Sequence, residues 1–479
     1  MTGEPASQPT PDLPDTWRPA PGARTLHGEV RGRTWLWSAA ARGGPTVLSC
    51  AATALVARLD GTRTWAEAAR DAGVAQDRAT SILDTLVSRG LVPPWSGRPP
   101  FPRPEPERRL SVWWHVTNAC NLACPHCYID TSSGEMSDEV AARTLARLLA
   151  TCAARDLKTV EIKVAGGEPL LRRTWLQQVA PRWRDVLKKA GVETRFVFLT
   201  NGTCIDRGVV RLLRSLPAVV SVSLDGIGEV QDRVRPGPKG LPSFARVREG
   251  LQRLVDGGIQ PYVLVTLSGD NAAGLGALGD FLMESGLGFR VSIERDLRTG
   301  ARRFADDPLA RALMDLYARV EARLPLGYRF IERHKLCDLS LLRPIRRACG
   351  AGETHLAVGH DGRAAACQAL LTTAGREPGD GEDLITAARD ARLGRGEPCA
   401  TCRECPFHQA CAGGCPLLLV RREEPGGGAN GTGPPDAPGA GAGAGGVSPY
   451  CEIFQAMIPR ILELAALDFV LREAVPGAR

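Results

Sequence analysis

Fifteen cysteines carry most of the chemistry available to this sequence, and ten or eleven of them fall into two tight groups. The first group is Cys120-x3-Cys124-x2-Cys127, directly after an apolar run at residues 111–116. Three thiolates from one short loop can hold three irons of a cubane cluster and leave the fourth iron without a protein ligand. An open position of this kind distinguishes a reactive metal centre from a structural one. A zinc knuckle is the alternative, but zinc sites usually take a second ligand pair, and none lies nearby.

Three short motifs follow the next three apolar runs of the chain. They are Gly166-Gly167-Glu168-Pro169, LTNGT at 199–203 and SLDG at 223–226. Glycines let a backbone approach a ligand closely, and a carboxylate can pair with an ammonium group. Each motif alone is typical of a turn. Together with the cysteine loop they place polar groups after four successive strands, an arrangement that chance does not explain.

The cysteine loop after the first strand of an α/β barrel resembles that of the radical S-adenosylmethionine (SAM) enzymes. In that family the open iron chelates the amino and carboxylate groups of SAM. One electron then cleaves SAM to methionine and a 5′-deoxyadenosyl radical, which takes a hydrogen atom from the substrate. The resemblance assigns to SAM the residues Gly166, Gly167, Glu168, Ser223, Asp225 and Arg235, with Arg233 as the alternative to Arg235. It also implies that His126 packs near the adenine and is not a metal ligand.

The second cysteine group resembles the SPASM extension, which holds two auxiliary [4Fe–4S] clusters in a subset of radical SAM enzymes. The resemblance assigns Cys349, Cys367 and Cys415 to one auxiliary cluster, and Cys402, Cys405, Cys411 and Cys451 to the other. The first of these clusters is then one ligand short. Cys337 and Cys399 are the candidates for this ligand, or the fourth iron stays open to substrate. Three [4Fe–4S] clusters per chain are therefore expected. A zinc ribbon built on C-x2-C pairs is the alternative.

Alternating apolar runs and helical patterns between residues 111 and 294 must position the first cysteine group. We predict strands at 111–116, 159–164, 194–199, 219–224, 262–267 and 289–293, and helices near 137–152, 174–190, 206–215, 243–256 and 273–285. Strands that alternate with helical crossovers indicate a parallel α/β sheet. Right-handed crossovers can roll six such units into a partial (β/α)6 barrel whose site lies at the carboxyl ends of the strands.

The N-terminal part has the pattern of a small winged-helix module. Residues 24–37 predict a hairpin or two, helical patterns cover about 64–71 and 76–89, and a short strand is expected at 89–92, with Gly90 ending the second helix. This part resembles the recognition domain, related to the peptide chaperone of PQQ synthesis, that binds leader peptides of ribosomally made natural products. There the leader adds a strand to a sheet edge. A DNA-binding winged helix is the alternative.

The expected fold class is α/β, with a partial radical SAM barrel between a winged-helix-like domain and a Cys-rich SPASM domain. The predicted boundaries are a disordered tail at 1–20, the peptide-recognition domain at 21–98, a Pro-rich linker at 99–108, the barrel at 109–330 and the SPASM domain at 331–479 with a flexible Gly/Pro insert at 425–448. The chain closes with an apolar helical stretch at 453–471, where Pro459 either kinks the helix or marks its start.

Composition excludes several protein classes. The chain has 479 residues and a net charge of +7, and no apolar run approaches the ~18 residues that span a bilayer. No export signal is visible, so we expect a cytoplasmic protein whose cysteines bind metal more often than they form disulfides. Transmembrane, secreted and fibrous classes are excluded, and neither nucleic acid nor membrane is expected as a partner. Cys50, Cys152 and Cys204, which lie outside the two groups, are predicted to be buried.

A leader-binding domain, a radical SAM core and a SPASM extension together imply a maturase that forms a thioether or carbon crosslink in a ribosomal precursor peptide. Its other partner is an electron donor such as flavodoxin or ferredoxin. No catalytic base is assigned; the polar residues near the SPASM entry are His334, Asp338, His360 and Gln368. A sulfatase-type (formylglycine) maturase is less favoured, because Gln368 occupies the position at which those enzymes have the Asp that serves as catalytic base. A quinone- or mycofactocin-type maturase also stays open, as does a winged-helix regulator with zinc or redox-sensing cysteines.

Overall fold

The computed structural model describes residues 13, 16–19, 21, 25–94, 108–295, 306–336, 339–345, 347–389, 400–418 and 448–473. Two compact units are present, one of Met1–Pro104, Ser340–Ile345 and Ile461–Arg479, and one of Glu105–Leu339 and Arg346–Arg460. Most of the expected tail at 1–20, most of the linker at 99–108 and nearly all of the insert at 425–448 lie outside the described residues. Of the tail, Leu13 is buried and Trp17 packs against the same hydrophobic core, so the expectation of disorder is wrong for these two residues. So do Cys337, Asp338 and Cys399.

The larger unit is built on a nine-stranded sheet with the order β10-β9-β8-β7-β6-β5-β4-β11-β12. Its strands are β4 (Arg109–His115), β5 (Thr159–Ala165), β6 (Glu193–Thr200), β7 (Ala218–Ser223), β8 (Tyr262–Leu267), β9 (Gly288–Ile293), β10 (His334–Leu336), β11 (His355–Val358) and β12 (Ala364–Ala365). All neighbours pair in parallel except β11 and β12. The six predicted strands and their parallel pairing are confirmed.

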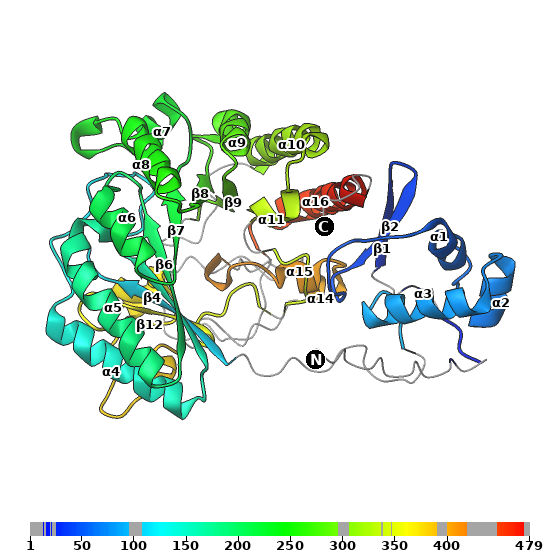
Figure 1. The fold of residues 1–479 in the computed structure, drawn as a ribbon, viewed down its shortest axis with the longest axis horizontal. Helices are drawn as coiled ribbons and strands as arrows, with labels where there is room; N and C mark the ends of the chain where they lie inside the picture. The colour runs from blue at the N-terminus through cyan, green and yellow to red at the C-terminus, as the bar shows by residue number, and fades with distance from the viewer. Residues whose placement is uncertain are drawn as a thin grey trace, which may run out of the picture. The chain divides into compact units, whose positions relative to one another are not determined.

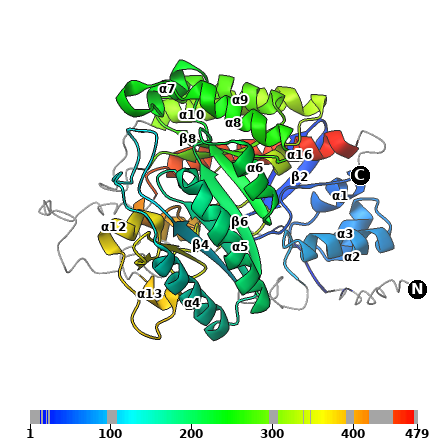
Figure 2. The same cartoon turned by 60° about the vertical axis from the view of Figure 1, so that its left-hand side comes forward.

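Helices cover one face of this sheet, as Figures 1 and 2 show for α4, α5, α6 and α8. The helices of the barrel are α4 (Asp138–Ala154), α5 (Arg173–Lys189), α6 (Arg207–Arg214), α7 (Glu229–Val234), α8 (Phe244–Asp256), α9 (Leu275–Glu284) and α10 (Asp306–Arg323). The side chains of β4 alternate between the face that the helices cover and the opposite face of the sheet. Leu110, Val112 and Trp114 are buried completely, and Trp114 stacks on Trp183 of α5 with ring centroids 4.0 Å apart. Because side chains alternate along a strand, His115 belongs to the opposite face.

Short elements make up the cysteine-rich part of the larger unit. They are α11 (Phe330–Arg333), α12 (Leu371–Ala374), α13 (Leu384–Ala387), α14 (Ala400–Glu404) and α15 (His408–Cys411). The 3-10 helices of the chain are η1 (Pro169–Arg172), η2 (Pro238–Gly240), η3 (Ala272–Gly274), η4 (Leu324–Leu326), η5 (Gln368–Leu370) and η7 (Pro416–Leu418). The last helix is α16 (Cys451–Glu473), which passes through Pro459. The expectation that Pro459 marks the start of this helix is wrong.

The smaller unit contains a three-stranded antiparallel sheet of β1 (Thr25–Val30), β2 (Arg33–Ser38) and β3 (Thr46–Val47). Its helices are α1 (Cys50–Val56), α2 (Trp65–Asp71) and α3 (Gln76–Ser88). The predicted hairpin is confirmed, and so are the helices predicted at about 64–71 and 76–89, which are α2 and α3. The strand expected at 89–92 is wrong: Gly90, at φ 75°, ends α3, and the Leu91 N–H donates to the Leu86 carbonyl at 2.9 Å. These residues therefore complete a helix terminus.

In the part of the chain that the structure describes, no helix combines the length and apolar character that a membrane span requires.

Candidate active site

The first cysteine group lies in the loop that leaves β4 at the carboxyl edge of the sheet. The pKa of Cys120 is raised to about 11, mainly by burial, and the charges of Glu168 and of the Cys124 and Cys127 thiols act in the same direction. Burial likewise raises the pKa of Cys124, against the opposing charge of Arg235. The structure thus brings the three thiols together at one place. Their mutual repulsion as thiolates would be relieved by bound iron, which is the chemistry expected of a cluster site.

Two glycines hold the next loop against this cysteine loop. The Gly167 N–H donates to the Thr117 carbonyl at 2.8 Å, and the Glu168 N–H donates to the Ala119 carbonyl at 2.8 Å. A Cβ atom on Gly166 would lie 2.3 Å from the Thr117 oxygen, and one on Gly167 would lie 2.3 Å from the Ala119 oxygen. The described contacts of these glycines are therefore with the cysteine loop itself, a packing role that the sequence analysis did not consider.

Substituting Gly167→Ala is expected to lower reductive SAM cleavage by about 10- to 100-fold, because the new methyl group displaces the backbone beside Cys120. Formation of 5′-deoxyadenosine under anaerobic conditions measures the effect. Gly379→Ala is the matched control, since a Cβ there meets its nearest atom at an ordinary 3.6 Å. Equal activity of the two variants would contradict this account of the loop.

Glu168 is fully buried, and its carboxylate accepts three hydrogen bonds. The donors are the Leu170 N–H at 3.0 Å, the Thr200 hydroxyl at 2.8 Å and the Asn201 N–H at 2.7 Å. Burial raises its pKa to about 7, although these hydrogen bonds act in the opposite direction. A nearby cation would favour the charged form, which suits the predicted pairing with an ammonium group.

The amides of Asn121 and Asn201 link the cysteine loop to the loop after β6. The Asn201 amide donates to Asn121 Oδ1 at 2.8 Å and approaches Cys120 Sγ at 3.9 Å. Asn121 in turn donates to the Thr203 hydroxyl at 2.9 Å. The sequence analysis did not assign these two asparagines. The TNG tripeptide was visible, but the partner on the cysteine loop depends on tertiary structure.

Arg235 and Asp225 form a buried ion pair beside the same loop. The Arg235 Nε–H donates to Asp225 Oδ2 at 2.6 Å, and the Thr266 N–H donates to Asp225 Oδ1 at 2.7 Å. Desolvation alone would lower the pKa of Arg235, but the charges of Asp225 and of the Cys124 thiolate raise it. His126 Nε2 lies 3.7 Å from Asp225 Oδ2. The charge of Arg235 therefore lies within electrostatic range of Cys124 and Cys127, at the place where the resemblance expects a partner for the SAM carboxylate.

The other predicted SAM contacts differ in their positions. Ser223 is the last residue of β7, at the carboxyl edge and partly buried. Arg233 is different, because its Nη2 donates to the Asp270 carbonyl at an exposed position. Of the two arginines proposed for the SAM carboxylate, Arg235 is therefore the one placed beside the cysteine loop.

The second cysteine group separates into two sets in the structure. The pKa of Cys367 is raised to about 11, mainly by burial, and the Cys415 and Cys349 thiols act in the same direction. These three are the cysteines that the sequence assigns to one auxiliary cluster. The fourth-ligand candidates lie outside the described residues.

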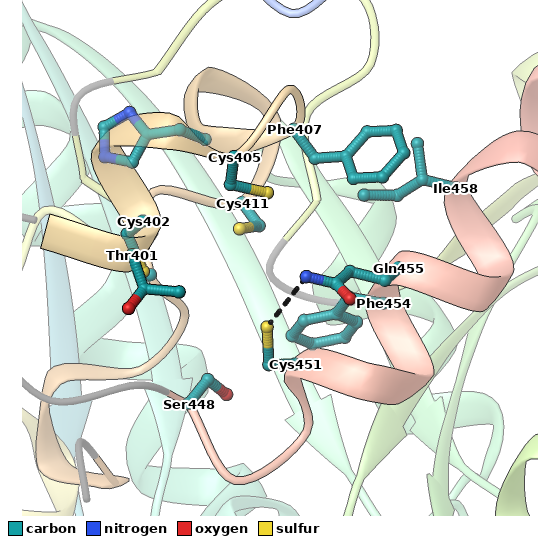
Figure 3. Close-up of a pocket in the computed structure, with 12 residues that line it drawn as sticks. Thr401, Cys402, Cys405, Phe407, Cys411, Ser448, Cys451, Phe454, Gln455 and Ile458 are labelled. Carbon is teal, nitrogen blue, oxygen red and sulfur yellow. Dashed lines mark hydrogen bonds between the residues drawn. The ribbon is translucent and has the colours of Figure 1, made fainter. Parts of the chain in front are cut away.

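The remaining four cysteines line a single small cavity, shown in Figure 3. They are Cys402, Cys405, Cys411 and Cys451. The thiols of Cys405, Cys411 and Cys451 face a common space, and Gln455 Nε2 donates to Cys451 Sγ at 3.5 Å. Within the described ranges no three His, Cys, Asp or Glu side chains are arranged around one metal ion. A cubane cluster makes a different demand, because each thiolate binds its own iron.

The three cysteines outside these sets lie in different environments. Cys152 is buried in α4, as predicted, whereas Cys204 is only partly buried and accepts a contact from the Asn121 amide at 3.4 Å. Cys50 is exposed at the first position of α1. The prediction that Cys50 is buried is therefore wrong, since its helix presents this position to solvent.

His334, one of the polar candidates, is a core residue. It is buried among aromatic rings, stacked on Phe330 at 5.4 Å and 4.7 Å from the ring of Phe289. Burial lowers its pKa to about 3. A histidine in this environment stays neutral at ordinary pH and is a poor candidate for the proton acceptor of a substrate reaction.

The buried His334 should make the protein sensitive to acid. Its pKa is depressed in the folded state, so its contribution to stability is complete above the unfolded value of about 6.5 and is lost as pH falls from there toward 3. From pH 7.5 to 5.5 we expect His334→Phe to lose about 1 kcal/mol less unfolding free energy than the wild type. Urea unfolding at both pH values, without oxygen, measures this difference. Identical losses in the two proteins would contradict it.

Comparisons with known proteins agree with this geometry. Residues 114–282 match the sequence profile of the Radical SAM superfamily. The serine-type anaerobic sulfatase-maturating enzyme of Klebsiella aerogenes is 27% identical over 336 residues, 65% of this chain and 82% of that protein. The mycofactocin maturase MftC of Mycobacterium tuberculosis (strain CDC 1551 / Oshkosh) is 26% identical over 320 residues, 64% of this chain and 78% of that protein.

Two further matches extend the comparison. The Fe-coproporphyrin III synthase of Methanosarcina barkeri (strain Fusaro / DSM 804) is 31% identical over 179 residues, 37% of this chain and only 42% of that protein's length. The solved structure of native anSMEcpe with bound AdoMet superposes with a TM-score of 0.59 at 17% identity, covering 74% of this chain and 99% of that one. This likeness shows a shared fold. Residues 114–282 of the chain therefore form a radical SAM domain, and the protein is an enzyme.

Proposed function

We propose that this enzyme is a peptide maturase that joins two side chains of a ribosomal precursor peptide through a thioether or carbon crosslink. The observation that carries the proposal is that Cys402, Cys405, Cys411 and Cys451 line one cavity, apart from the cysteine loop that follows β4. This separation supports the proposed assignment of the ten cysteines to one SAM-binding cluster and two auxiliary clusters. The similarity to two maturases over about two thirds of this chain also supports it.

Bound SAM and its cluster would supply a carbon radical that removes a hydrogen atom from the peptide. The residues of this chain would hold SAM in place. Glu168 would pair with the SAM ammonium and Arg235 with its carboxylate, while Asp225 holds Arg235 in position. Gly166 and Gly167 would keep the cysteine loop fixed against the loop that carries Glu168.

The smaller unit would bind the leader of the precursor. Among the residues that the structure describes, β1 pairs with β2 alone, and its other edge would accept the added strand. The domain limits that we propose are 21–98 for this recognition domain, 109–330 for the barrel and 331–479 for the SPASM domain. The electrons would come from a donor such as flavodoxin or ferredoxin in the cytoplasm.

The test uses peptides encoded by the short open reading frames beside the gene, incubated with reconstituted enzyme, SAM and dithionite without oxygen. We expect one peptide to lose two hydrogen atoms per crosslink, with one 5′-deoxyadenosine formed for each. Fragmentation spectra should show a closed ring. No modification of any neighbouring peptide would contradict the proposal.

The main alternative, formylglycine formation, is supported by the similarity to the sulfatase-maturating enzyme. Oxidation of a serine to an aldehyde also removes two hydrogen atoms, so mass alone does not separate the two reactions. An aldehyde reacts with a hydrazide reagent, whereas a crosslink does not. Gln368 follows Cys367 and contacts its thiol at 3.5 Å. It cannot serve as a carboxylate base, which favours the crosslink.

A further inference from the structure

Lys163 and Arg290 place two cations on the inner face of the barrel, which is the face of the nine-stranded sheet opposite α4, α5, α6 and α8. The residues on either side of Lys163 in β5 are fully buried, whereas its own side chain is 30% exposed. In β9 the residues on either side of Arg290 are buried, and Arg290 is exposed. Because side chains alternate along a strand, both cations lie on the inner face, where a ligand can reach them. Neither was assigned to SAM or to a cluster.

The stagger of the barrel puts these two cations at the same height. The register between β5 and β9, which are four steps apart in the strand order, is given by the pairs Lys163–Val197, Val197–Val219, Ser221–Tyr262 and Tyr262–Gly288. Along these pairs the row of Lys163 meets β9 four residues before Arg290. Barrels of parallel strands stagger by about one residue per strand, so the four steps bring Lys163 level with Arg290. The same stagger adds Ser221 of β7 and His355 of β11 to these two residues, and the four form one cationic layer.

Electrostatic effects agree with a layer that closes across the inner face. Burial lowers the pKa of Lys163, and the charge of Arg290 acts in the same direction, against the charge of Glu161. On a flat sheet four strand spacings would separate the two cations by about 19 Å, where solvent largely screens their charges. The curvature of the barrel must therefore bring them closer together. Burial also lowers the pKa of His355 to about 4, with the charge of Lys163 acting in the same direction, so this histidine is neutral at ordinary pH.

Too little negative charge surrounds the cationic layer to pair with both cations. Lys163 Nζ lies 3.7 Å from Glu161 Oε1, but Arg109 Nη2 donates to the other oxygen of this carboxylate at 2.9 Å. The Arg290 side chain makes neither a hydrogen bond nor an ion pair with any residue that the structure describes. Layers inside such barrels usually consist of branched apolar side chains. A layer with two cations and one shared carboxylate therefore favours an anionic ligand.

Apolar side chains lie between the cationic layer and the carboxyl edge of the sheet. They are Trp113 of β4, Leu199 of β6 and Leu264 of β8, all partly buried on the inner face. Lys163 is two residues before the end of β5, about 7 Å along the strand. A side chain that enters from this edge would therefore pass apolar groups first and reach the cations with its tip. Asp and Glu side chains have this composition, since methylene groups precede their carboxylate.

We propose that Lys163 and Arg290 hold the carboxylate of an Asp or Glu side chain of the peptide substrate. The ammonium and the guanidinium would both donate to this carboxylate in charge-assisted hydrogen bonds. The bound carboxylate would balance the charge of the layer and hold the peptide at the edge where the cysteine loop lies. This inference rests on the proposed function and adds to it the chemical class of one substrate residue.

The enzyme variants are Lys163→Met and Arg290→Met, tested in the full-length reconstituted enzyme with the neighbouring-frame peptide that the wild type modifies. Each removes one cation, and Arg290 is exposed, so its substitution leaves the packing of the core unchanged. We expect kcat/KM for the peptide to fall about 10- to 100-fold, mainly through KM. Lys163→Arg and Arg290→Lys keep the charge and should recover most of the loss.

SAM cleavage without peptide separates this site from the SAM site. In Lys163→Met and Arg290→Met it should stay within about twofold of the wild type, at an unchanged KM for SAM. A raised KM for SAM would show that the cationic layer binds the carboxylate of SAM, and would overturn the inference.

Peptide variants identify the bound carboxylate. Each Asp of the peptide is replaced in turn by Asn and each Glu by Gln, and the C-terminal carboxylate is amidated in a separate peptide. At one side-chain position the wild-type enzyme should lose about 10- to 100-fold in kcat/KM while Arg290→Met loses nothing further, which is the coupling expected of a direct contact. Coupling to the C-terminal amide alone, or at no position, would overturn the inference.

Arg195→Met is the matched control. Arg195 is an exposed cation of β6 that pairs in register with Glu161, two residues nearer the amino end of the sheet than Lys163. The substitution changes the net charge as Arg290→Met does, and it should leave kcat/KM for the peptide within about twofold of the wild type. Equal losses in the two variants would show that overall charge alone attracts the peptide, and would overturn this assignment alone. A wild type that modifies no peptide would overturn the proposed function, and this assignment with it.

Discussion

Replacing Cys124 with alanine is expected to abolish reductive SAM cleavage and to lower the iron content from about 12 to about 8 atoms per chain. Cys124 lies between Cys120 and Cys127 in the loop after β4, where all three thiols influence one another. Loss of one ligand leaves two thiolates for the cluster, too few to hold it. Iron, acid-labile sulfide and 5′-deoxyadenosine, measured on anaerobically reconstituted protein, report the effect together.

Cys411→Ala is the informative comparison, because its thiol belongs to the four-cysteine cavity. We expect SAM cleavage without peptide to persist in this variant, so that the two variants separate the clusters by function. Three thiolates remain after Cys411→Ala, so it is the further change Cys405→Ala that should lower the iron content to about 8 atoms per chain. The exposed Cys50 provides the matched control, and Cys50→Ala should match the wild type in every measurement. Zinc without sulfide in the wild-type protein would contradict the cluster assignments.

The barrel could be predicted from the sequence because its strands and helices have long local patterns. β6, for example, is an eight-residue strand that contains the apolar run Phe196–Leu199, and α4 is a 17-residue amphipathic helix that Ser137 caps by accepting from the Val140 N–H. β10, β11 and β12 were missed for the opposite reason. They have two to four residues each, and they are strands only because of their pairing, β10 with β9, β11 with β4 and β12 with β11.

The candidate site could be predicted where its residues are close in the chain. The cysteine spacing is such a local signal. It predicts ten cluster ligands, and four of them, Cys402, Cys405, Cys411 and Cys451, line one cavity of the structure. Pairings across the fold were out of reach. Nothing in the sequence indicates that the carboxylate of Asp225 is taken by Arg235 and Thr266, or that His115 lines a cavity with His360. These contacts arise from loops that meet only in three dimensions.

The buried pair of Arg235 and Asp225 leads to the second large prediction. The side chains are 14% and 1% exposed, so Arg235→Met would leave a carboxylate buried without its cation. Breaking such a pair typically costs about 3–5 kcal/mol of unfolding free energy. We expect a loss in this range, together with loss of SAM cleavage, from anaerobic urea unfolding and 5′-deoxyadenosine measurements.

An exposed pair of the same chemistry supplies the control for stability. Arg63 and Asp60 also form an ion pair, but each side chain is 42% exposed. Arg63→Met should therefore cost less than about 1 kcal/mol, because solvent already screens that pair. A loss of similar size in both variants would show that the Arg235 pair is not buried as the structure describes.

A double variant separates the two roles of Arg235. Adding Asp225→Asn to Arg235→Met removes the unpaired charge and keeps an amide oxygen that can accept from the Thr266 N–H. Stability should then recover in part. If Arg235 binds the SAM carboxylate, SAM cleavage stays lost in the double variant, because no cation remains beside the cysteine loop. If Arg235 only neutralises Asp225, cleavage returns together with stability, and the assignment of Arg235 to SAM is wrong.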